Sequence, residues 1–114
     1  MADKKILITG ATGFVGRSLC RFLKSSGYMV CPTARVKPSN HSEFKYFVTG
    51  NISGASNWSQ VLTDVDTVIH LAARAHILND KSNNPLDNYR RANTVPTIKL
   101  GCDAIKLGVR RFIF

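Results

Sequence analysis

The sequence has few acidic residues, few cysteines and no long apolar run. Asp and Glu total 7 against 16 Lys and Arg, so the 114 residues carry a formal net charge of +9. The longest apolar runs, near Ile6 and Val68, are far shorter than the roughly 20 residues of a membrane-spanning helix. The first residues lead through a short apolar run into a glycine-rich turn, unlike a secretory signal. We therefore expect neither a membrane-spanning nor a secreted protein.

The cysteines give no sign of a disulfide framework or a metal site. Cys20, Cys31 and Cys102 are odd in number and widely spaced, and they form no Cys-x-x-Cys pair. The three histidines do not complete a ligand set with them. We expect a cytoplasmic protein without a bound metal, in which reduced thiols behave as small apolar side chains.

The apolar content is sufficient for one compact core. Apolar residues make up 44% of the chain and include one Trp and six Phe, which excludes a disordered chain. The basic residues are spread along the sequence, which is typical of a solvated basic surface. Nucleic-acid binding is the competing interpretation and predicts affinity that falls steeply with salt. We expect no nucleic-acid partner, although one or two arginines could hold a phosphate.

Apolar segments with strand character alternate with amphipathic helical segments. Strands are expected at residues 4–9, 29–34, 45–48, 67–73 and 110–114. Helices are expected from Val15 to about Gly27, at residues 56–62, and at residues 84–107 with a kink at Pro96. Pro32 fits its strand poorly, because proline cannot donate to a ladder. This alternation predicts an α/β fold with parallel strands and right-handed crossovers.

The strongest local motif is a glycine-rich turn between the first strand and the first helix. Gly10, Gly13 and Gly16 fulfil a G-x-x-G-x-x-G spacing, and Thr12 adds a hydroxyl. The first glycine permits a tight turn, the second lets a diphosphate approach the backbone, and the third lets the helix pack closely. The amino terminus of the helix would face the anion. No Gly-Lys-Ser/Thr follows, which excludes a P-loop.

Residues 6–16, Ile-Leu-Ile-Thr-Gly-Ala-Thr-Gly-Phe-Val-Gly, resemble the opening of the extended short-chain dehydrogenase/reductase family. Within it, the likeness is to NAD(P)-dependent sugar-nucleotide epimerases and dehydratases. Residues 50–52, 68–73, 93–97 and 108–114 resemble four further segments of that family, in order. The resemblance implies a Rossmann-type doubly wound parallel sheet. Residues 1–114 would be the amino-terminal part of this dinucleotide-binding domain, truncated before its carboxyl-terminal strands and substrate region.

The resemblance also implies a set of cofactor-binding residues. They are Gly10, Thr12, Gly13, Phe14, Val15, Gly16, Arg35, Asn51, Ile52, Leu71, Ala72, Ala73 and Asn93. Three positions depart from the family pattern. Asn51 stands where the family usually has Asp, although its amide can still accept a hydrogen bond from adenine. Pro96 replaces a glycine and Thr94 a valine, which affects the local geometry of the helix.

The residue at the position that would bind the adenosine ribose is not acidic. A carboxylate expected at the end of the second strand would bind the 2′-hydroxyl of NAD, but Ala34 stands there and Arg35 follows. A guanidinium at this place could pair with the 2′-phosphate of NADP. The epimerase resemblance favours NAD instead, so NAD and NADP both remain open, with Arg35 slightly favouring NADP.

The chain lacks the catalytic pair of the family. No tyrosine is followed four positions later by lysine, since Pro32, Gly50 and Asn93 stand four residues after the three tyrosines. In the family that tyrosine is the general acid/base and the lysine lowers its pKa. We therefore expect no catalytic residue and no activity in this chain by itself. The parent protein would be a nucleotide-sugar epimerase, dehydratase or reductase acting by hydride transfer.

Two further interpretations follow from the resemblance. The parent could be a non-catalytic relative that uses the dinucleotide as a sensor or scaffold. A homodimer is also plausible, because family members commonly pair through the helix near Asn93.

Two polar residues on apolar segments have alternative interpretations. His70 lies in a buried strand and is expected to be a hydrogen-bonded core residue, with catalysis the weaker alternative. Asn93 would support the active site by resemblance, or would satisfy backbone groups as an ordinary buried polar residue.

Overall fold

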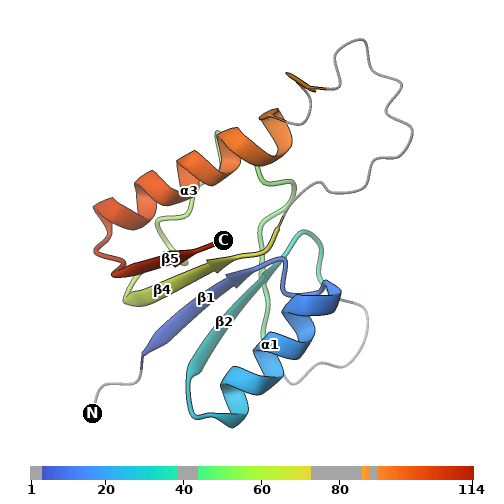
Figure 1. The fold of residues 1–114 in the computed structure, drawn as a ribbon, viewed down its shortest axis with the longest axis vertical. Coiled ribbons are helices and arrows are strands. Elements are labelled where there is room, and N and C mark those ends of the chain that lie inside the picture. The colour runs from blue at the N-terminus through green and yellow to red at the C-terminus, as the bar shows by residue number, and fades with distance from the viewer. Residues whose placement is uncertain (1–3, 39–43, 73–85, 88–89) are drawn as a thin grey trace.

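The structure is a computed structural model that describes residues 4–38, 44–72, 86–87 and 90–114. Five parallel strands form one sheet in the order β3-β2-β1-β4-β5 (Figure 1). The strands are β1 (Lys5–Thr9), β2 (Met29–Ala34), β3 (Phe47–Val48), β4 (Val65–His70) and β5 (Arg111–Ile113). The helices are α1 (Phe14–Ser25), the π-helical segment η1 (Arg90–Thr94) and α3 (Val95–Lys106). The expected α/β class and Rossmann-type parallel sheet are confirmed.

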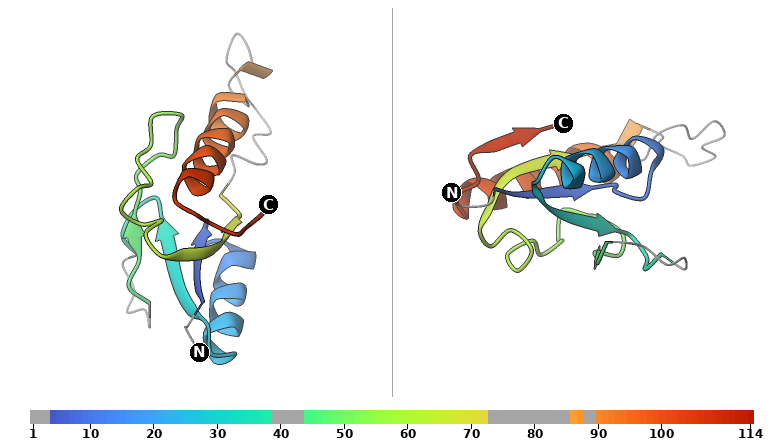
Figure 2. Two further views of the ribbon diagram at one scale, coloured as in Figure 1. Left: turned by 90° about the vertical axis from the view of Figure 1, so that its left-hand side faces the viewer. Right: turned by 90° about the horizontal axis from the view of Figure 1, so that it is seen from below.

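The two faces of the sheet bury separate apolar cores. On one face, α1 covers Ile6 and Ile8 of β1 and contributes the buried Cys20. On the other, Leu7 and Val68 pack with residues of α3 and of the segment between β3 and β4, namely Trp58, Val61, Leu62, Leu100 and Ala104. Figure 2 shows α1 and that segment on opposite sides of the sheet. Successive strand residues therefore point to different cores, as in a parallel sheet buried on both faces.

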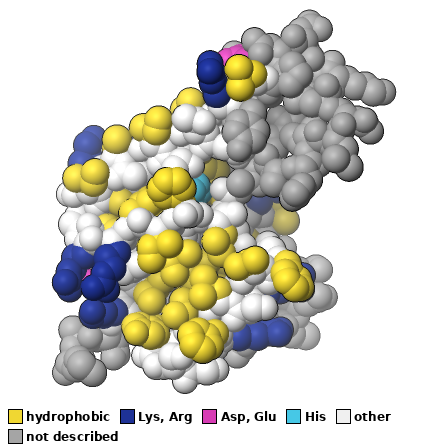
Figure 3. Space-filling view, in the orientation of Figure 1, with side chains coloured by type: hydrophobic (Ala, Val, Ile, Leu, Met, Phe, Trp, Pro, Cys, Tyr) yellow, Lys and Arg dark blue, Asp and Glu magenta, His cyan; other side chains and the backbone are white. Residues whose placement is uncertain are grey.

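The face that carries α1 is only partly covered. Ile69 pairs in register with Ile113, and Ile113 is exposed. On α1 itself, Val15 and Phe22 are also exposed, and apolar side chains occupy much of this view of the surface (Figure 3). Beyond α1, this face of β4 and β5 has an apolar surface with no described element packed on it.

Pro32 is accommodated within β2 because its imino nitrogen faces an unpaired stretch. The carbonyl of Thr33 accepts from Ala11 on the β1 side, whereas the carbonyl of Ala34 accepts from Thr49 on the β3 side. Backbone groups alternate along a strand, so the nitrogen of Pro32 points to the β3 side. The β3 pairing begins only at Thr33. The proline therefore removes no ladder hydrogen bond.

The helix expected at residues 56–62 is wrong. The segment forms consecutive turns, in which the Leu62 amide donates to the Trp58 carbonyl at 3.0 Å. The side chain of Asn57 accepts from the Ser59 amide at 3.0 Å, a local bond that competes with helix. Asp64 has a φ of 62°, which no right-handed helix can continue. The apolar spacing predicted correctly that this segment is buried, but the helix that it predicted does not form.

The helix expected at residues 84–107 is not one continuous α-helix among the described residues. The α-helix begins at Val95, so Pro96 lies in its first turn, and five π-helical residues precede it. Proline has no N–H for the carbonyl four residues back, which explains why regular α-helix cannot cross this point. The helix start expected at residues 84–85 lies outside the described residues. Gly27 ends α1 with a φ of 92°, as expected of the residue after a helix.

The buried state of the thiols agrees only in part with the expectation. Cys20 is buried, which raises the pKa of its thiol to about 11, whereas Cys102 is exposed and is not a core residue. Within the described ranges, no group of three or more His, Cys, Asp and Glu residues is placed to hold a metal. No helix there has the length and apolar character of a membrane span.

Candidate functional site

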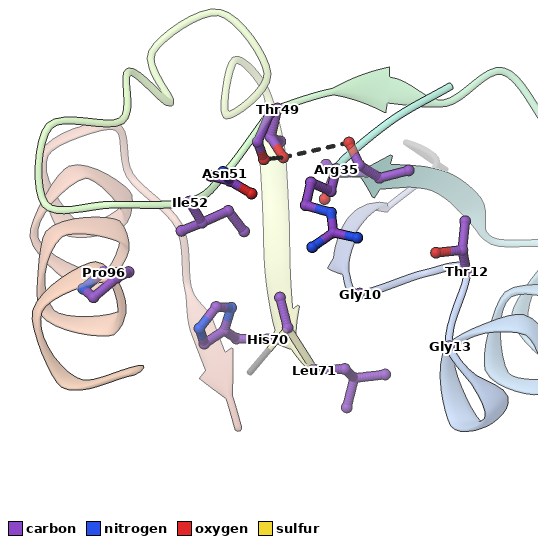
Figure 4. Close-up of a pocket in the computed structure, with 14 residues that line it drawn as sticks. Gly10, Thr12, Gly13, Arg35, Thr49, Asn51, Ile52, His70, Leu71 and Pro96 are labelled. Atoms are coloured by element: carbon purple, nitrogen blue, oxygen red, sulfur yellow. Dashed lines mark hydrogen bonds between the residues drawn. The ribbon is translucent and has the colours of Figure 1, made fainter. Parts of the chain in front are cut away.

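A cavity of about 680 Å³ opens at the carboxyl ends of β1, β2 and β4 (Figure 4). In open parallel sheets, ligands bind at this edge, and the volume suits a small-molecule site. The lining residues come from the glycine turn, the end of β2, the turn after β3, the end of β4 and α3. They are Gly10, Thr12, Gly13, Thr33, Ala34, Arg35, Thr49, Gly50, Asn51, Ile52, His70, Leu71, Ala72 and Pro96.

The glycine turn has the geometry that its spacing predicts. Gly10 has a φ of 65°, and a Cβ there would lie 2.8 Å from the Ala72 amide nitrogen. A Cβ on Gly16 would overlap the Gly10 carbonyl oxygen and lie 2.8 Å from the Ala11 Cα. The first glycine thus permits the turn against β4, and the third permits α1 to pack on that turn.

The amino terminus of α1 is open toward the cavity. Gly13 is its N-cap, no side chain caps it, and its first turn contains no acidic residue. The unpaired amides and the helix dipole make such an end favourable for an anion. Gly13 lines the cavity without a Cβ, so a bulky anion can reach these amides. The arrangement is suited to a diphosphate.

The cavity wall carries a basic side chain between two of its turns. Among the described residues that line it, Arg35 is the only charged side chain, and no carboxylate is present. Its guanidinium lies between the glycine turn and the Thr49–Asn51 turn (Figure 4). That turn is tied to the end of β2, because the Gly50 amide donates to the Arg35 carbonyl at 3.0 Å. A ligand with phosphate at one end and a purine beside Ile52 would match these surfaces.

His70 is buried and hydrogen-bonded at both ring nitrogens. Its Nδ1 lies 2.6 Å from the Thr9 hydroxyl, and its Nε2 lies 3.0 Å from the Thr97 hydroxyl. Burial lowers the pKa of this imidazole, so it is neutral near physiological pH. This confirms the interpretation of His70 as a packed, hydrogen-bonded residue, although it also lines the cavity.

The lowered pKa of His70 makes stability depend on pH. The unfolded chain binds a proton at the ordinary pKa of about 6.5, whereas the folded chain binds it only at lower pH. The stabilising contribution of the neutral His70 is therefore fully present above the ordinary pKa, and it decreases as the pH falls below that value. We expect the free energy of unfolding, measured with urea, to fall from about pH 7.5 to about pH 5.5. His70→Gln should reduce this fall; equal slopes in both proteins would contradict the assignment.

The structure distributes the candidate cofactor-binding residues in three ways. Eight of them line the cavity: Gly10, Thr12, Gly13, Arg35, Asn51, Ile52, Leu71 and Ala72. Phe14, Val15 and Gly16 form the first turn of α1 and are not among the lining residues; Phe14 is 88% exposed and Gly16 is buried. Asn93 lies in η1 and is not among the lining residues, and Ala73 lies outside the described residues.

Sequence reasoning missed five residues of this region. Thr33, Thr49 and Pro96 line the cavity, and the two hydroxyls of Thr9 and Thr97 hold His70. Thr9 could have been noticed because it directly precedes the glycine turn at the end of β1. Thr97 gave no such signal, because its contact with β4 spans 27 residues.

Comparison with known proteins agrees with this geometry. Residues 6–114 match the model of the NAD dependent epimerase/dehydratase family. UDP-glucose 4-epimerase of Vibrio cholerae is 39% identical over 111 residues, which are 97% of this chain and 34% of that protein. The chain therefore spans about a third of the length of this relative.

Solved structures give the same result for the fold. MoeE5 in complex with UDP-glucuronic acid and NAD superposes with a TM-score of 0.77 and 29% identity, over 97% of this chain and 35% of that one. A short-chain dehydrogenase/reductase superfamily protein from Agrobacterium tumefaciens with bound NAD gives a TM-score of 0.75 at 29% identity, over 95% and 31%. The glycine turn, the parallel sheet and these matches together show that the chain belongs to the NAD-dependent epimerase/dehydratase family.

Proposed function

We propose that these residues bind a nicotinamide adenine dinucleotide as the cofactor-holding part of an enzyme acting on nucleotide sugars. The observation that carries the proposal is the open amino terminus of α1, which faces the cavity across a glycine without a Cβ. The related proteins bound to NAD and UDP-sugars support the ligand class. In such an enzyme the cofactor would accept a hydride from a sugar carbon, and an epimerase would return it to the other face.

Each part of the cavity has a defined role in this proposal. The amides at the start of α1 hold the diphosphate, and Thr12 adds a hydroxyl beside them. Asn51 and Ile52 contact the adenine, the former by accepting from its amino group and the latter by apolar packing. Leu71 and Ala72, at the end of β4, lie along the path toward the nicotinamide. None of these groups transfers a proton, and we propose that the chain by itself is inactive.

Titration calorimetry with NAD, NADP and ADP-ribose tests the proposal directly. We expect all three to bind, because the contacts proposed here lie mainly with the adenosine diphosphate part. A chain that bound none of them would refute the cofactor role. A turnover signal with a UDP-sugar and cofactor would refute the proposed inactivity of the isolated chain.

Arg35 is proposed to pair with the 2′-phosphate of NADP. Its charge is not offset by any carboxylate among the described lining residues. We expect Arg35→Asp to weaken NADP binding by about tenfold or more, because a charge-assisted hydrogen bond contributes about 1.5–3 kcal/mol. NAD should bind nearly as before. The measurement is the ratio of the two Kd values, with Arg35→Lys as the charge-conserving control; an unchanged ratio would refute the phosphate contact.

We also propose that α3 mediates pairing between two copies of the chain. Its inner side buries Pro96, Leu100 and Ala104, yet Val95, Ile98 and Ile105 on it are exposed. A helix that is apolar on both sides is typical of a helix that packs against a second surface as well as its own core. We expect sedimentation velocity to show a dimer and Ile98→Glu to yield a monomer. If the wild-type chain is monomeric, or if the variant still pairs, the α3 contact is wrong.

A further inference from the structure

Three elements of the cavity wall meet at His70. Thr9 ends β1 directly before the glycine turn, His70 ends β4, and Thr97 lies in the first turn of α3. Their side chains form a continuous hydrogen-bonded chain across the sheet edge, with contacts that span 61 and 27 residues of sequence.

The first end of this chain fixes the proton on Thr9. The Thr9 hydroxyl oxygen accepts from the Leu71 amide at 3.0 Å and from the Ala72 amide at 3.1 Å. Both lone pairs are then occupied, because a hydroxyl has two acceptor sites and one donor. The hydroxyl proton must therefore be donated to Nδ1 of His70, which carries no proton of its own.

The other end gives the same answer independently. The Thr97 hydroxyl donates to the Asn93 carbonyl at 2.6 Å, so toward His70 it can only accept. Nε2 of His70 therefore carries the ring proton and donates it. Two separate donor and acceptor counts agree on one neutral tautomer.

The chain of hydrogen bonds also sets the cavity walls. The Thr9 hydroxyl binds both the Leu71 and the Ala72 amides. The same backbone lies so close to Gly10 that an added Cβ would contact it. Thr97 fixes the last turn of η1 beside Pro96, which forms the opposite wall. His70 is the only side chain among these described residues that bonds to both hydroxyls.

We propose that His70 is a positioning residue for the dinucleotide, held as the neutral Nε2–H tautomer, and that it ties α3 to the glycine turn. The proposal rests on the function proposed above. It assigns His70 no contact with a transferred hydride or proton. Its effect on the ligand is exerted through Thr9 and Thr97.

Nitrogen NMR of chain labelled with 15N-histidine tests the tautomer without any ligand. We expect one histidine, identified by its loss in His70→Gln, to show an unprotonated Nδ1 and a protonated Nε2 near neutral pH. A protonated Nδ1, or rapid exchange between tautomers, would overturn the proposal. A buried histidine with only a packing role would not require one fixed tautomer.

Variants that keep one of the two hydrogen bonds of His70 test the positioning role. Asn at position 70 can still accept from Thr9, and Gln can still donate to Thr97, so each loses one link. We expect either variant to weaken NAD or NADP binding by about tenfold, which corresponds to about 1.4 kcal/mol. Thr97→Val should weaken binding in the wild-type background but add little to His70→Asn, since the link is already broken.

The control removes a hydroxyl from the other end of the same strand. Thr67 is buried in β4 and bonds only locally to Asp66 at 2.7 Å, so Thr67→Val should leave dinucleotide binding unchanged. Equal Kd values for the wild type, the His70 variants and Thr97→Val would overturn the positioning role alone. No binding by the wild-type chain would overturn the cofactor role as well, while the NMR result would still report the tautomer.

Discussion

Replacing Gly16 by alanine is expected to destabilise the chain strongly. The new Cβ would overlap the Gly10 carbonyl oxygen and lie 2.8 Å from the Ala11 Cα. These are backbone atoms of the turn, which cannot rotate away as a side chain can, so α1 must move off the sheet. We expect the free energy of unfolding to fall by about 3 kcal/mol, near the upper end for overpacked cores.

The measurement is urea unfolding followed by circular dichroism. Gly101→Ala is the matched control, because it lies within α3 and an added Cβ there meets nothing within 4 Å. That change should stabilise the helix by up to about 1 kcal/mol, since alanine is the better helix former. If Gly16→Ala unfolded at the same urea concentration as the wild type, the close packing of α1 on the turn would be wrong.

Replacing Gly13 by alanine is expected to abolish most dinucleotide binding with little effect on stability. Its φ of −71° is open to any residue, and a Cβ would lie 3.3 Å from the Gly10 carbonyl oxygen, a contact that a small shift relieves. The same Cβ would project where the diphosphate must approach the amides of α1. Loss of charge-assisted bonds worth about 3 kcal/mol corresponds to a Kd raised by about a hundredfold.

Calorimetry with NAD and unfolding in urea, performed on the same preparation, separate the two effects. Gly101→Ala again serves as control and should bind the dinucleotide as the wild type does. Tight binding by Gly13→Ala would show that the diphosphate lies elsewhere. Unfolding of this variant at much lower urea would instead assign Gly13 a structural role like that of Gly16.

The local part of the site was accessible from the sequence. β1, the glycine turn and α1 are contiguous, and each glycine answers a requirement set by residues within the same few turns of backbone. The spacing of Gly10, Gly13 and Gly16 therefore predicted the tight turn and the close packing that the structure shows. Gly27 was predicted at the end of α1 for the same reason.

Local pattern failed where tertiary contacts decided the conformation. Trp58, Val61 and Leu62 have a helical spacing, yet they are buried from a series of turns, because burial requires only that the side chains reach the core. Pro96 was expected to kink a long helix, but it lies in the first turn of α3 after a π-helical segment.

The sequence by itself determined the fold class and the turn that faces the cavity, because these depend on residue types at short spacing. The tertiary structure decided the strand order, the outline of the cavity and the Thr9–His70–Thr97 chain. A hydroxyl and an imidazole that are distant in sequence carry no mutual signal in a single chain. Their hydrogen bonds exist only because parallel pairing brings the carboxyl ends of β1 and β4 together beneath α3.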